Sequence, residues 1–503
     1  MTSMKRKLSL MAVAGMMSAS AWAGGLLHNT NQHIAFVRML ARGASHEIDA
    51  VFTNPAGLAY MDHEGWTLSL NLQSVSQRRD VLTTFPMFTQ ADHTRLYEGT
   101  VFVPVVPSFY GAFKRNKWTF SGFFGFVGGG GKCNFDSGLP LFDASVMAGV
   151  AGQSRQLLQG AKEKFAPLIE QNPGILAQYP LTAALLQQGY IDPSYYGTSM
   201  AMKGRQYIYG LQFGATYRII DWLSVYGGVR INYFSGNYKG HINTTGNEKL
   251  AAAVTEMMPL VKTLAPEYES AILAMAGEGG LANVKLDCTQ TGWGITPIVG
   301  VDVVWNGLTL AAKYEFRTSL DIENDNKTFE SDVPDAFKDK MNDYRHGVNT
   351  PNDLPSVLYT AIGYEIIPDK LRATVEYHYY DDKHAGMAHD KQRTLRHGTH
   401  EVLAGAEWDI NKTFTVSCGI QNTDYGLSDG YQSHTSFSCD SYSIGLGGAI
   451  NLSKKVKLNA GYFWTNYKDY RREEADYFGT ALPGKDTYSR DNKVLGVGID
   501  IKL

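Results

Sequence analysis

Residues 223–233 read LSVYGGVRINY, and apolar and polar side chains largely alternate along them. Leu223 and Ile231 fall on one face, whereas Ser224 and Arg230 fall on the other. Successive side chains of a β-strand point to opposite faces of the sheet. A period of two therefore predicts a strand with one apolar and one polar face.

The same period recurs from Trp66 to the C-terminus, most clearly in residues 308–317, 371–379 and 495–503. The segments between strands alternate between tiny and long. The tiny connections are 115–116, 221–222, 306–307, 368–369, 411–412 and 453–454. The long connections are about 77–98, 132–204, 242–286, 324–352, 384–397, 425–437 and 468–487. Short turns at one rim and long loops at the other are typical of outer-membrane barrels, so we predict an all-β fold, a transmembrane antiparallel β-barrel of about 14 strands.

Composition agrees with a membrane barrel and excludes other classes. Charged residues make up 19% of the 503 residues, below the share that is usual in soluble domains. The formal net charge of -3 argues against a general nucleic-acid binder. Beyond the first two dozen residues, the sequence has no apolar run long enough for a membrane-spanning helix.

The N-terminus carries the signals of export. Basic residues at positions 5–7 precede an apolar stretch from Leu8 to about Ala21, and Ala-Trp-Ala at 21–23 fits a cleavage site. We therefore predict that residues 1–23 are a signal peptide and that the mature chain lies in the outer membrane of a Gram-negative cell. The spacing of the cysteines leaves their disulfide state open. They are Cys133, Cys288, Cys418 and Cys439.

Two of the long loops, at about 132–204 and 242–286, do not have the composition of coil. In the second, apolar residues recur at the three- and four-residue steps of a helical stripe. The stripe consists of Leu250, Val254, Met257, Val261 and Leu264. Pro259 lies inside it, and we expect this proline to kink the helix or split it in two. The stripe either packs against other helices or forms an apolar surface that captures a ligand.

Residues 24–62 precede the first strand and do not alternate. They contain ARGAS at 41–45 and AVFTNPAGL at 50–58, where Asn-Pro followed by Ala-Gly predicts a turn. In an exported chain, ahead of such a barrel, these strings resemble the outer-membrane long-chain fatty acid transporter family of the FadL/TodX type, which includes importers of aromatic hydrocarbons. The architecture matches over nearly the whole mature chain, whereas the motif match is confined to the N-terminal segment.

The resemblance implies that residues 24–62 form a hatch in the lumen of a barrel made by residues 63–503. The residues of its signature turn would be Asn54, Pro55, Ala56 and Gly57. It also implies that the helical loops capture a hydrophobic substrate, which enters an apolar pocket beside the hatch and leaves sideways into the bilayer. The implied partners are hydrophobic small molecules, long-chain fatty acids foremost, with outer-membrane lipid and lipopolysaccharide. The resemblance implies a passive monomeric transporter without a cofactor or a nucleic-acid partner.

The third expected strand contains the candidate for the sideways exit. It ends in four consecutive glycines, and glycine weakens a strand and marks bulges. They are Gly128, Gly129, Gly130 and Gly131. The alternative is a flexible start of the following long loop.

Alternation places several basic residues on the inner face of the barrel, where a carboxylate head group would need a cation. These candidates are Arg230, Lys313, Arg317 and Arg372. Glu315, Glu376 and Glu407 are expected on the same face. The alternative is therefore a network of ion pairs that holds hatch and barrel together.

Three other functions remain open: a porin-like channel for small polar solutes, a surface receptor and a barrel-borne hydrolase. The hydrolase hypothesis rests on the GLSDG string at 426–430, with His434 close by. That string requires a strand before it and a helix after it, and a polar loop follows instead. His397 and His400 match no metal motif, so we predict no metal site and no catalysis.

Overall fold

The computed structural model of this protein describes residues 25–277, 281–331 and 345–503. The predicted signal peptide, residues 1–23, lies outside the described residues. Within the described part of the chain, no helix has both the length and the apolar composition needed to cross a membrane.

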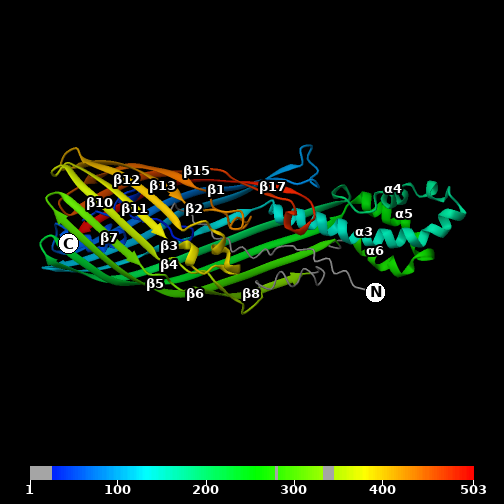
Figure 1. The fold of residues 1–503 in the computed structure, drawn as a ribbon, viewed down its shortest axis with the longest axis horizontal. Helices are drawn as coiled ribbons and strands as arrows, with labels where there is room; N and C mark the ends of the chain where they lie inside the picture. Colours follow the sequence, from blue (N-terminus) through cyan, green and yellow to red (C-terminus); the bar gives the residue numbers. More distant parts are fainter. Residues whose placement is uncertain (1–24, 278–280, 332–344) are drawn as a thin grey trace.

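Fourteen antiparallel strands form a closed barrel in the described chain (Figure 1). The ring closes because the first strand pairs with both the second strand and the last. The strands in ring order are β1 (Gly65–Thr84), β2 (Thr94–Arg115), β3 (Trp118–Phe135), β4 (Tyr196–Ile220), β5 (Leu223–Gly246), β6 (Ala282–Trp305), β7 (Leu308–Glu315), β10 (Val357–Ile367), β11 (Leu371–Tyr380), β12 (Thr399–Asp409), β13 (Phe414–Asp424), β14 (Ser441–Asn451), β15 (Val456–Tyr467) and β17 (Gly484–Lys502). The predicted antiparallel barrel is confirmed.

The tiny connections form tight turns at one rim, where the C-terminus also lies (Figure 1). In the turn between β6 and β7, Asn306 and Gly307 both have positive φ, at 49° and 78°. That backbone suits the right-handed twist of a hairpin and favours Asn-Gly. The local turn signals in the sequence therefore mark this rim correctly.

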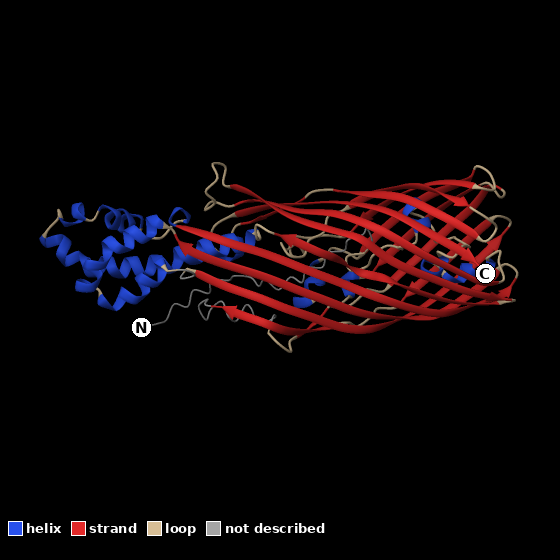
Figure 2. Cartoon of the chain, turned by 180° about the vertical axis from the view of Figure 1, so that it is seen from behind, coloured by secondary structure: helices blue, strands red, loops and turns tan. Residues whose placement is uncertain are grey.

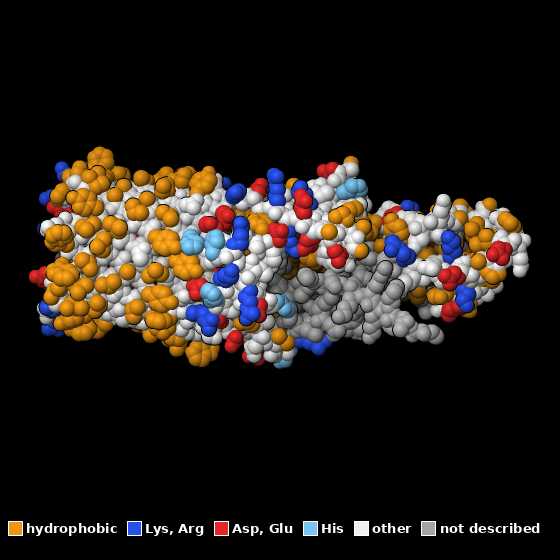
Figure 3. Space-filling view, in the orientation of Figure 1, with side chains coloured by type: hydrophobic (Ala, Val, Ile, Leu, Met, Phe, Trp, Pro, Cys, Tyr) orange, Lys and Arg blue, Asp and Glu red, His pale blue; other side chains and the backbone are white. Residues whose placement is uncertain are grey.

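Large apolar side chains are exposed on every strand of the ring, and on the face drawn in Figure 3 they form an apolar belt over the half of the barrel nearest the short turns. Phe102 and Trp293 are each 67% exposed, and Trp305 is 66% exposed. A soluble protein does not expose so large a contiguous apolar surface. The belt is the surface that faces the hydrocarbon of a bilayer. Charged side chains follow it in the direction of the helical domain (Figure 3).

The wall of the barrel is much taller on one side than on the other. β4, β5 and β6 have 25, 24 and 24 residues, whereas β11 has 10. A tilted strand needs only about 9–11 residues to span a membrane. The tall strands therefore project beyond the membrane. Short strands extend the wall further: β8 (Asp321–Ser331), β9 (Asn349–Pro351) and β16 (Tyr470–Glu474).

The projecting strands carry a helical domain at their far end (Figure 2). It is built from α3 (Pro140–Gln171), η2 (Ile175–Gln178), α4 (Pro180–Gln188), η3 (Pro193–Tyr195), α5 (Glu248–Leu264), η4 (Pro266–Tyr268) and α6 (Glu269–Ala276). Pro259 does not split the helix in two, because α5 runs through this residue as one helix. The helices share one apolar core. Three short 3-10 helices lie in other outer loops: η6 (Asp382–His384), η7 (Ala388–Thr394) and η8 (Tyr477–Gly479).

The segment before β1 lies inside the barrel and is almost entirely buried. It contains α1 (Ile34–Arg38), α2 (Ala50–Thr53) and η1 (Pro55–Tyr60). α1 contacts β14, β15 and β17, whereas η1 contacts β4, β5 and β6 on the opposite side of the ring. The segment therefore spans the lumen from wall to wall.

Candidate functional site

The ladder between β2 and β3 is interrupted within the length of both strands. Val101 pairs with Cys133, and the next pair is Phe109 with Phe124. In the described backbone, the residues between these two pairs make no β2–β3 ladder contact. We call this interval, residues 102–108 of β2 and 125–132 of β3, the β2–β3 gap.

The sequence accounts for the β2–β3 gap on both sides. On β2, Pro104 and Pro107 have no backbone N–H to donate to a ladder. On β3, Gly129 has a φ of 85°, and register shifts flank Gly128 where β3 pairs with β4. A side chain at Gly129 would meet the Gln206 carbonyl at 2.5 Å, so only glycine fits there. The predicted glycine run at 128–131 therefore lies within an irregular strand.

Residues of the N-terminal segment occupy the inner side of the β2–β3 gap. The side-chain amide of Gln32 accepts a hydrogen bond from Phe126 N at 3.1 Å and donates one to Phe126 O. Asn29 N donates to Val127 O at 2.9 Å. Ser108 Oγ on the other edge donates to Gln32 O at 3.4 Å. These contacts satisfy backbone groups that the missing ladder would leave unpaired.

The predicted signature turn lies at the junction of α2 and η1. Asn54 is extended, with φ -151° and ψ 95°, as the residue before a proline prefers. Its Nδ2 donates to Val301 O and to Asp302 Oδ2, each at 3.2 Å. A Cβ at Gly57 would lie 2.5 Å from Ser45 O, which requires glycine at this position. The backbone carbonyl oxygens of the turn accept two more bonds from the wall, from Thr216 to Pro55 at 2.7 Å and from Ser224 to Ala56 at 2.8 Å.

One buried carboxylate anchors the other half of the N-terminal segment. Glu407 on β12 pairs with Arg38, with Arg42 and with Arg372. Arg38 also donates to Ser417 Oγ at 2.8 Å, and Arg42 pairs with Asp49 at 2.8 Å. A buried charge is tolerated only when it is paired and hydrogen-bonded, and this cluster meets that condition.

The candidate head-group cations are already paired. Arg230 and Lys313 both pair with Glu315, and Lys313 Nζ also donates to Phe52 O at 2.6 Å. Arg372 binds Glu407, as described, and Asp409 at 2.9 Å. This arrangement favours the ion-pair network over a free site for a carboxylate.

Arg317 is a correction to the predicted lumenal set. Its side chain is 56% exposed and donates to the His384 carbonyl at 2.9 Å. β7 ends at Glu315, so the alternation that placed Arg317 inside does not extend to it.

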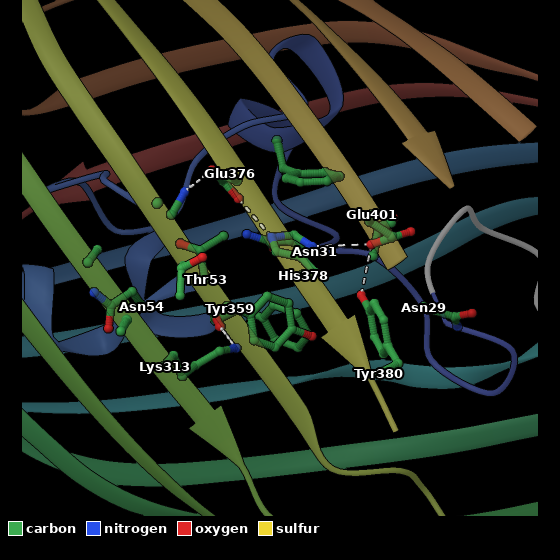
Figure 4. Close-up of a pocket in the computed structure, with 18 residues that line it drawn as sticks. Asn29, Asn31, Thr53, Asn54, Lys313, Tyr359, Glu376, His378, Tyr380 and Glu401 are labelled. Carbon is green, nitrogen blue, oxygen red and sulfur yellow. Dashed lines mark hydrogen bonds and ion pairs between the residues drawn. The ribbon is translucent and has the colours of Figure 1, made fainter. Parts of the chain in front are cut away.

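The lumenal cavity beside the N-terminal segment is small, and both apolar and charged residues line it (Figure 4). Its volume is about 30 Å³. Figure 4 shows His378 between Glu376 and Glu401, at 2.9 and 3.2 Å, with Tyr380 donating to Glu401 at 3.1 Å. Such a cavity holds about one water molecule and not a hydrocarbon chain. This cavity is therefore not the apolar pocket that the resemblance implies.

α3 closes the outer mouth of the barrel. Leu141 and Phe142, in its first turn, are buried between the tall strands. Leu141 N donates to Nδ1 of His434 at 3.0 Å, so the proton of this ring is on Nε2, 2.9 Å from Asp486. Asp143 pairs with Arg95 at 2.5 Å; burial raises the pKa of Asp143, although the bond from Tyr97 and the charge of Arg95 oppose the rise.

The candidate capture stripe on α5 lies inside the helical domain. Leu250, Met257 and Val261 are fully buried, Val254 is buried, and Leu264 packs at the edge of the same core. Of the two possibilities that the sequence left open, this conformation shows packing against other helices. A role of these side chains in capture stays a prediction. α3, α4 and α6 cover the stripe because each helix has its own apolar face to bury.

The residues behind the alternative functions take other roles. Both ring nitrogens of His434 form hydrogen bonds, with Leu141 N and with Asp486, so neither is left to activate Ser428 as the hydrolase hypothesis requires. Among the described residues, no cluster of His, Cys, Asp or Glu could hold a metal ion. The four cysteines are not bridged.

Sequence reasoning missed several residues that matter here. His378 precedes a histidine-rich outer loop in the sequence, yet it lies on the inner face of β11. Its position on the same alternating face as Glu376 was the available signal. The two prolines in β2 were a second signal, because proline inside a central strand breaks its ladder.

Comparisons with known proteins identify the fold. No protein-family model matches this chain, and no curated protein matches it. The crystal structure of a Pseudomonas aeruginosa FadL homologue superposes with a TM-score of 0.61 at 12% identity, over 95% of this chain and all of the homologue. The toluene transporter TodX of Pseudomonas putida superposes with a TM-score of 0.50 at 12% identity, over 91% of this chain and 94% of TodX. This chain is an outer-membrane β-barrel with the FadL/TodX-type fold.

Proposed function

We propose that this protein carries hydrophobic compounds, long-chain fatty acids foremost, across the outer membrane by passive diffusion. Residues 25–62 act as the hatch, and the β2–β3 gap is the exit into the bilayer. The structural similarity to TodX, which is a toluene transporter, supports this proposal. We expect no catalysis.

The observation that carries the proposal is the β2–β3 gap in the apolar belt. Phe102 and Val105, which lie in this gap on β2, are 67% and 58% exposed. Lipid-exposed backbone without partners is not tolerated in hydrocarbon, so such a gap needs a compensating structure. Here the polar groups of Asn29 and Gln32 provide it, from a segment that is not part of the wall.

Opening the exit requires only a local movement of the hatch. The residues that bridge the gap, 29–32, precede the anchors at Arg38 and Asn54. Each hydrogen bond contributes about 1 kcal/mol net, so releasing the few bonds of Gln32 and Asn29 is feasible by thermal motion. Release of the whole hatch would also break buried ion pairs, at a cost of several kcal/mol each.

The driving force is partition between apolar environments. Each Å² of apolar surface removed from water contributes about 25 cal/mol, which favours transfer from water to protein. Transfer from protein to lipid is nearly neutral, so release follows the concentration gradient. The porin alternative requires an open aqueous lumen, and the described cavity of about 30 Å³ argues against it.

Uptake measurements test the proposal. Cells without their own fatty acid transporter would express this chain and receive labelled oleate or a small labelled sugar. We expect oleate uptake without sugar uptake. Sugar uptake without oleate uptake would support the porin, and uptake of neither solute by an assembled barrel would favour the receptor.

A double variant tests the exit. Pro104→Val combined with Pro107→Val restores two N–H donors to β2 and should lengthen the ladder between β2 and β3. We expect the narrower gap to slow oleate uptake. Pro297→Val is the matched control, because Pro297 is also exposed on the wall but lies opposite Val229 in the continuous ladder between β5 and β6. Equal oleate uptake by the double variant and the control would exclude the β2–β3 gap as the route.

A further inference from the structure

The outer wall of the barrel contains an apolar hollow beside the β2–β3 gap. It has a volume of about 510 Å³ and lies on the surface formed by β17, β1, β2, β3 and β4. The outward side chains along it are Leu68, Leu70, Phe109, Phe124, Leu211, Phe213, Ile499 and Ile501. No charged side chain lines it. We call it the wall groove.

Two glycines form the floor of the wall groove. Gly111 and Gly122 are a cross-strand pair on β2 and β3, with large apolar side chains on either side of them. Neither glycine has a positive φ. A Cβ at Gly111 would come no closer than 3.5 Å to a neighbour, and one at Gly122 no closer than 3.4 Å. The backbone therefore accepts a side chain at both positions, and the missing side chains create the hollow.

The wall groove begins where the β2–β3 gap ends. Phe109 and Phe124 form the last ladder pair before the gap, and both line the groove. Gly111 and Gly122 follow towards the short turn that joins β2 to β3. A chain that emerges from the gap and moves towards the inner leaflet meets this hollow first.

We propose that the wall groove seats the hydrocarbon chain of a transported molecule immediately after it has passed the β2–β3 gap. This inference rests on the proposed function and adds a site outside the barrel to it. Lipid tails are as apolar as the groove, so binding there depends on close packing and not on the hydrophobic effect. The groove recognises the chain and not the head group, because its lining carries no charge.

Filling the groove tests the inference in the full-length protein. The double variant Gly111→Leu, Gly122→Leu places two side chains in the hollow. The double variant Gly111→Ala, Gly122→Ala fills it in part and replaces the leucine variant in the test if that variant assembles poorly. Gly227→Leu is the matched control, since Gly227 lies exposed on β5 and a Cβ added there would have no atom within 4 Å. The amount of assembled barrel is measured for every variant.

The readouts are oleate uptake in cells and photolabelling in proteoliposomes by a diazirine-bearing C18 fatty acid. We expect the leucine variant to lower uptake, and labelling of peptides that contain Phe109 and Phe124, by about tenfold. The control should match the wild type in both. Wild-type uptake and labelling after filling would overturn the inference. A diazirine-bearing phosphatidylethanolamine provides a second check on the same peptides. If it labels them as strongly as the fatty acid does, and added oleate does not reduce this labelling, a resident lipid occupies the groove and the inference is overturned.

The failure of the inference can be told apart from the failure of the proposed function. If the wild type takes up no oleate, the proposed function fails, and the inference falls with it. If the wild type takes up oleate and groove-filled variants do so equally well, only the wall groove is excluded.

Discussion

At the scale of residues, the hatch is held by charges that have no water to solvate them. Glu407 is fully buried and faces Arg38, Arg42 and Arg372. The first two arginines belong to the hatch and the third to β11, so the carboxylate joins hatch and wall. Removing one partner of such a cluster costs more than the cluster itself contributes, because the remaining charges stay buried.

Glu407→Gln should loosen the hatch without preventing assembly of the barrel. We expect a loss of about 3–5 kcal/mol from the hatch–wall contact. Single-channel recordings in planar bilayers should then show frequent openings that the wild type lacks. Glu365→Gln is the control, because Glu365 is exposed on β10. A variant that stays as closed as the control would show that other contacts hold the hatch.

A second residue makes stability depend on pH. Asp382, in η6 outside the membrane, is buried, and burial raises its pKa to about 7 from 3.8 even though Thr399 donates to it. Between these values the folded chain binds the proton more tightly than the unfolded chain, so stability should fall as pH rises from about 4 to 7. Asp382→Asn should remove up to about 4 kcal/mol of this dependence.

Melting temperatures between pH 4 and pH 8 in detergent would measure the effect. Asp390→Asn is the control, because Asp390 is exposed in the same loop, at a positive φ that asparagine tolerates. Parallel pH profiles for the wild type and Asp382→Asn would contradict the assignment.

At the scale of elements, α3 serves two regions that are otherwise separate. Its first turn fills the barrel mouth between the tall strands, and its later turns join the core formed with α4, α5 and α6. Because these are distinct apolar clusters, the helical domain can change its packing without disturbing the barrel. Any capture of substrate by this domain therefore requires its helices to part.

Met257→Ala should destabilise the helical domain by about 2–5 kcal/mol, as expected for a fully buried methionine. Limited proteolysis should then cut faster within the helical segments 140–195 and 248–276, while the barrel stays intact. Leu273→Ala is the control, because Leu273 on α6 is 46% exposed. If both variants are cut at the same rate, Met257 does not support the core.

At the scale of the whole molecule, the barrel is closed twice. The hatch spans the lumen within the apolar belt, and α3 closes the mouth above it. Among the described strands of the ring, the longest interruption between two stretches of one ladder is the β2–β3 gap, which opens sideways. Under the proposed function, this architecture would block axial flow of water and solutes and direct movement towards lipid.

Deletion of residues 25–60 behind the signal peptide should convert the protein into an open pore. Fourteen strands lie between the roughly eight that side chains fill and the roughly 16–18 that enclose an aqueous channel. We expect a large, steady conductance and sugar uptake by cells. The control is the wild type at an equal amount of assembled barrel. A deletion variant that remains closed would mean that α3 alone seals the lumen.

Much of this architecture could be predicted because its signals are local. The period of two along residues 223–233 reflects the pleat of one strand. Asn306-Gly307 likewise specifies the turn between β6 and β7 without help from the rest of the chain. The turn at Asn54 is likewise a property of an Asn-Pro sequence. These patterns determined the barrel, its strand faces and the separate N-terminal segment.

Only the tertiary structure decided which residues meet. Arg230 and Glu315 are 85 positions apart, and Gln32 and Phe126 are 94 apart, so no local pattern could pair them. Whether the α5 stripe was covered or open depended on helices from another loop. The sequence by itself determined the strands and their faces, because the backbone geometry of a strand repeats locally. The tertiary structure decided the β2–β3 gap, the pairing of the lumenal charges and the closed mouth of the barrel, because these depend on contacts between distant segments.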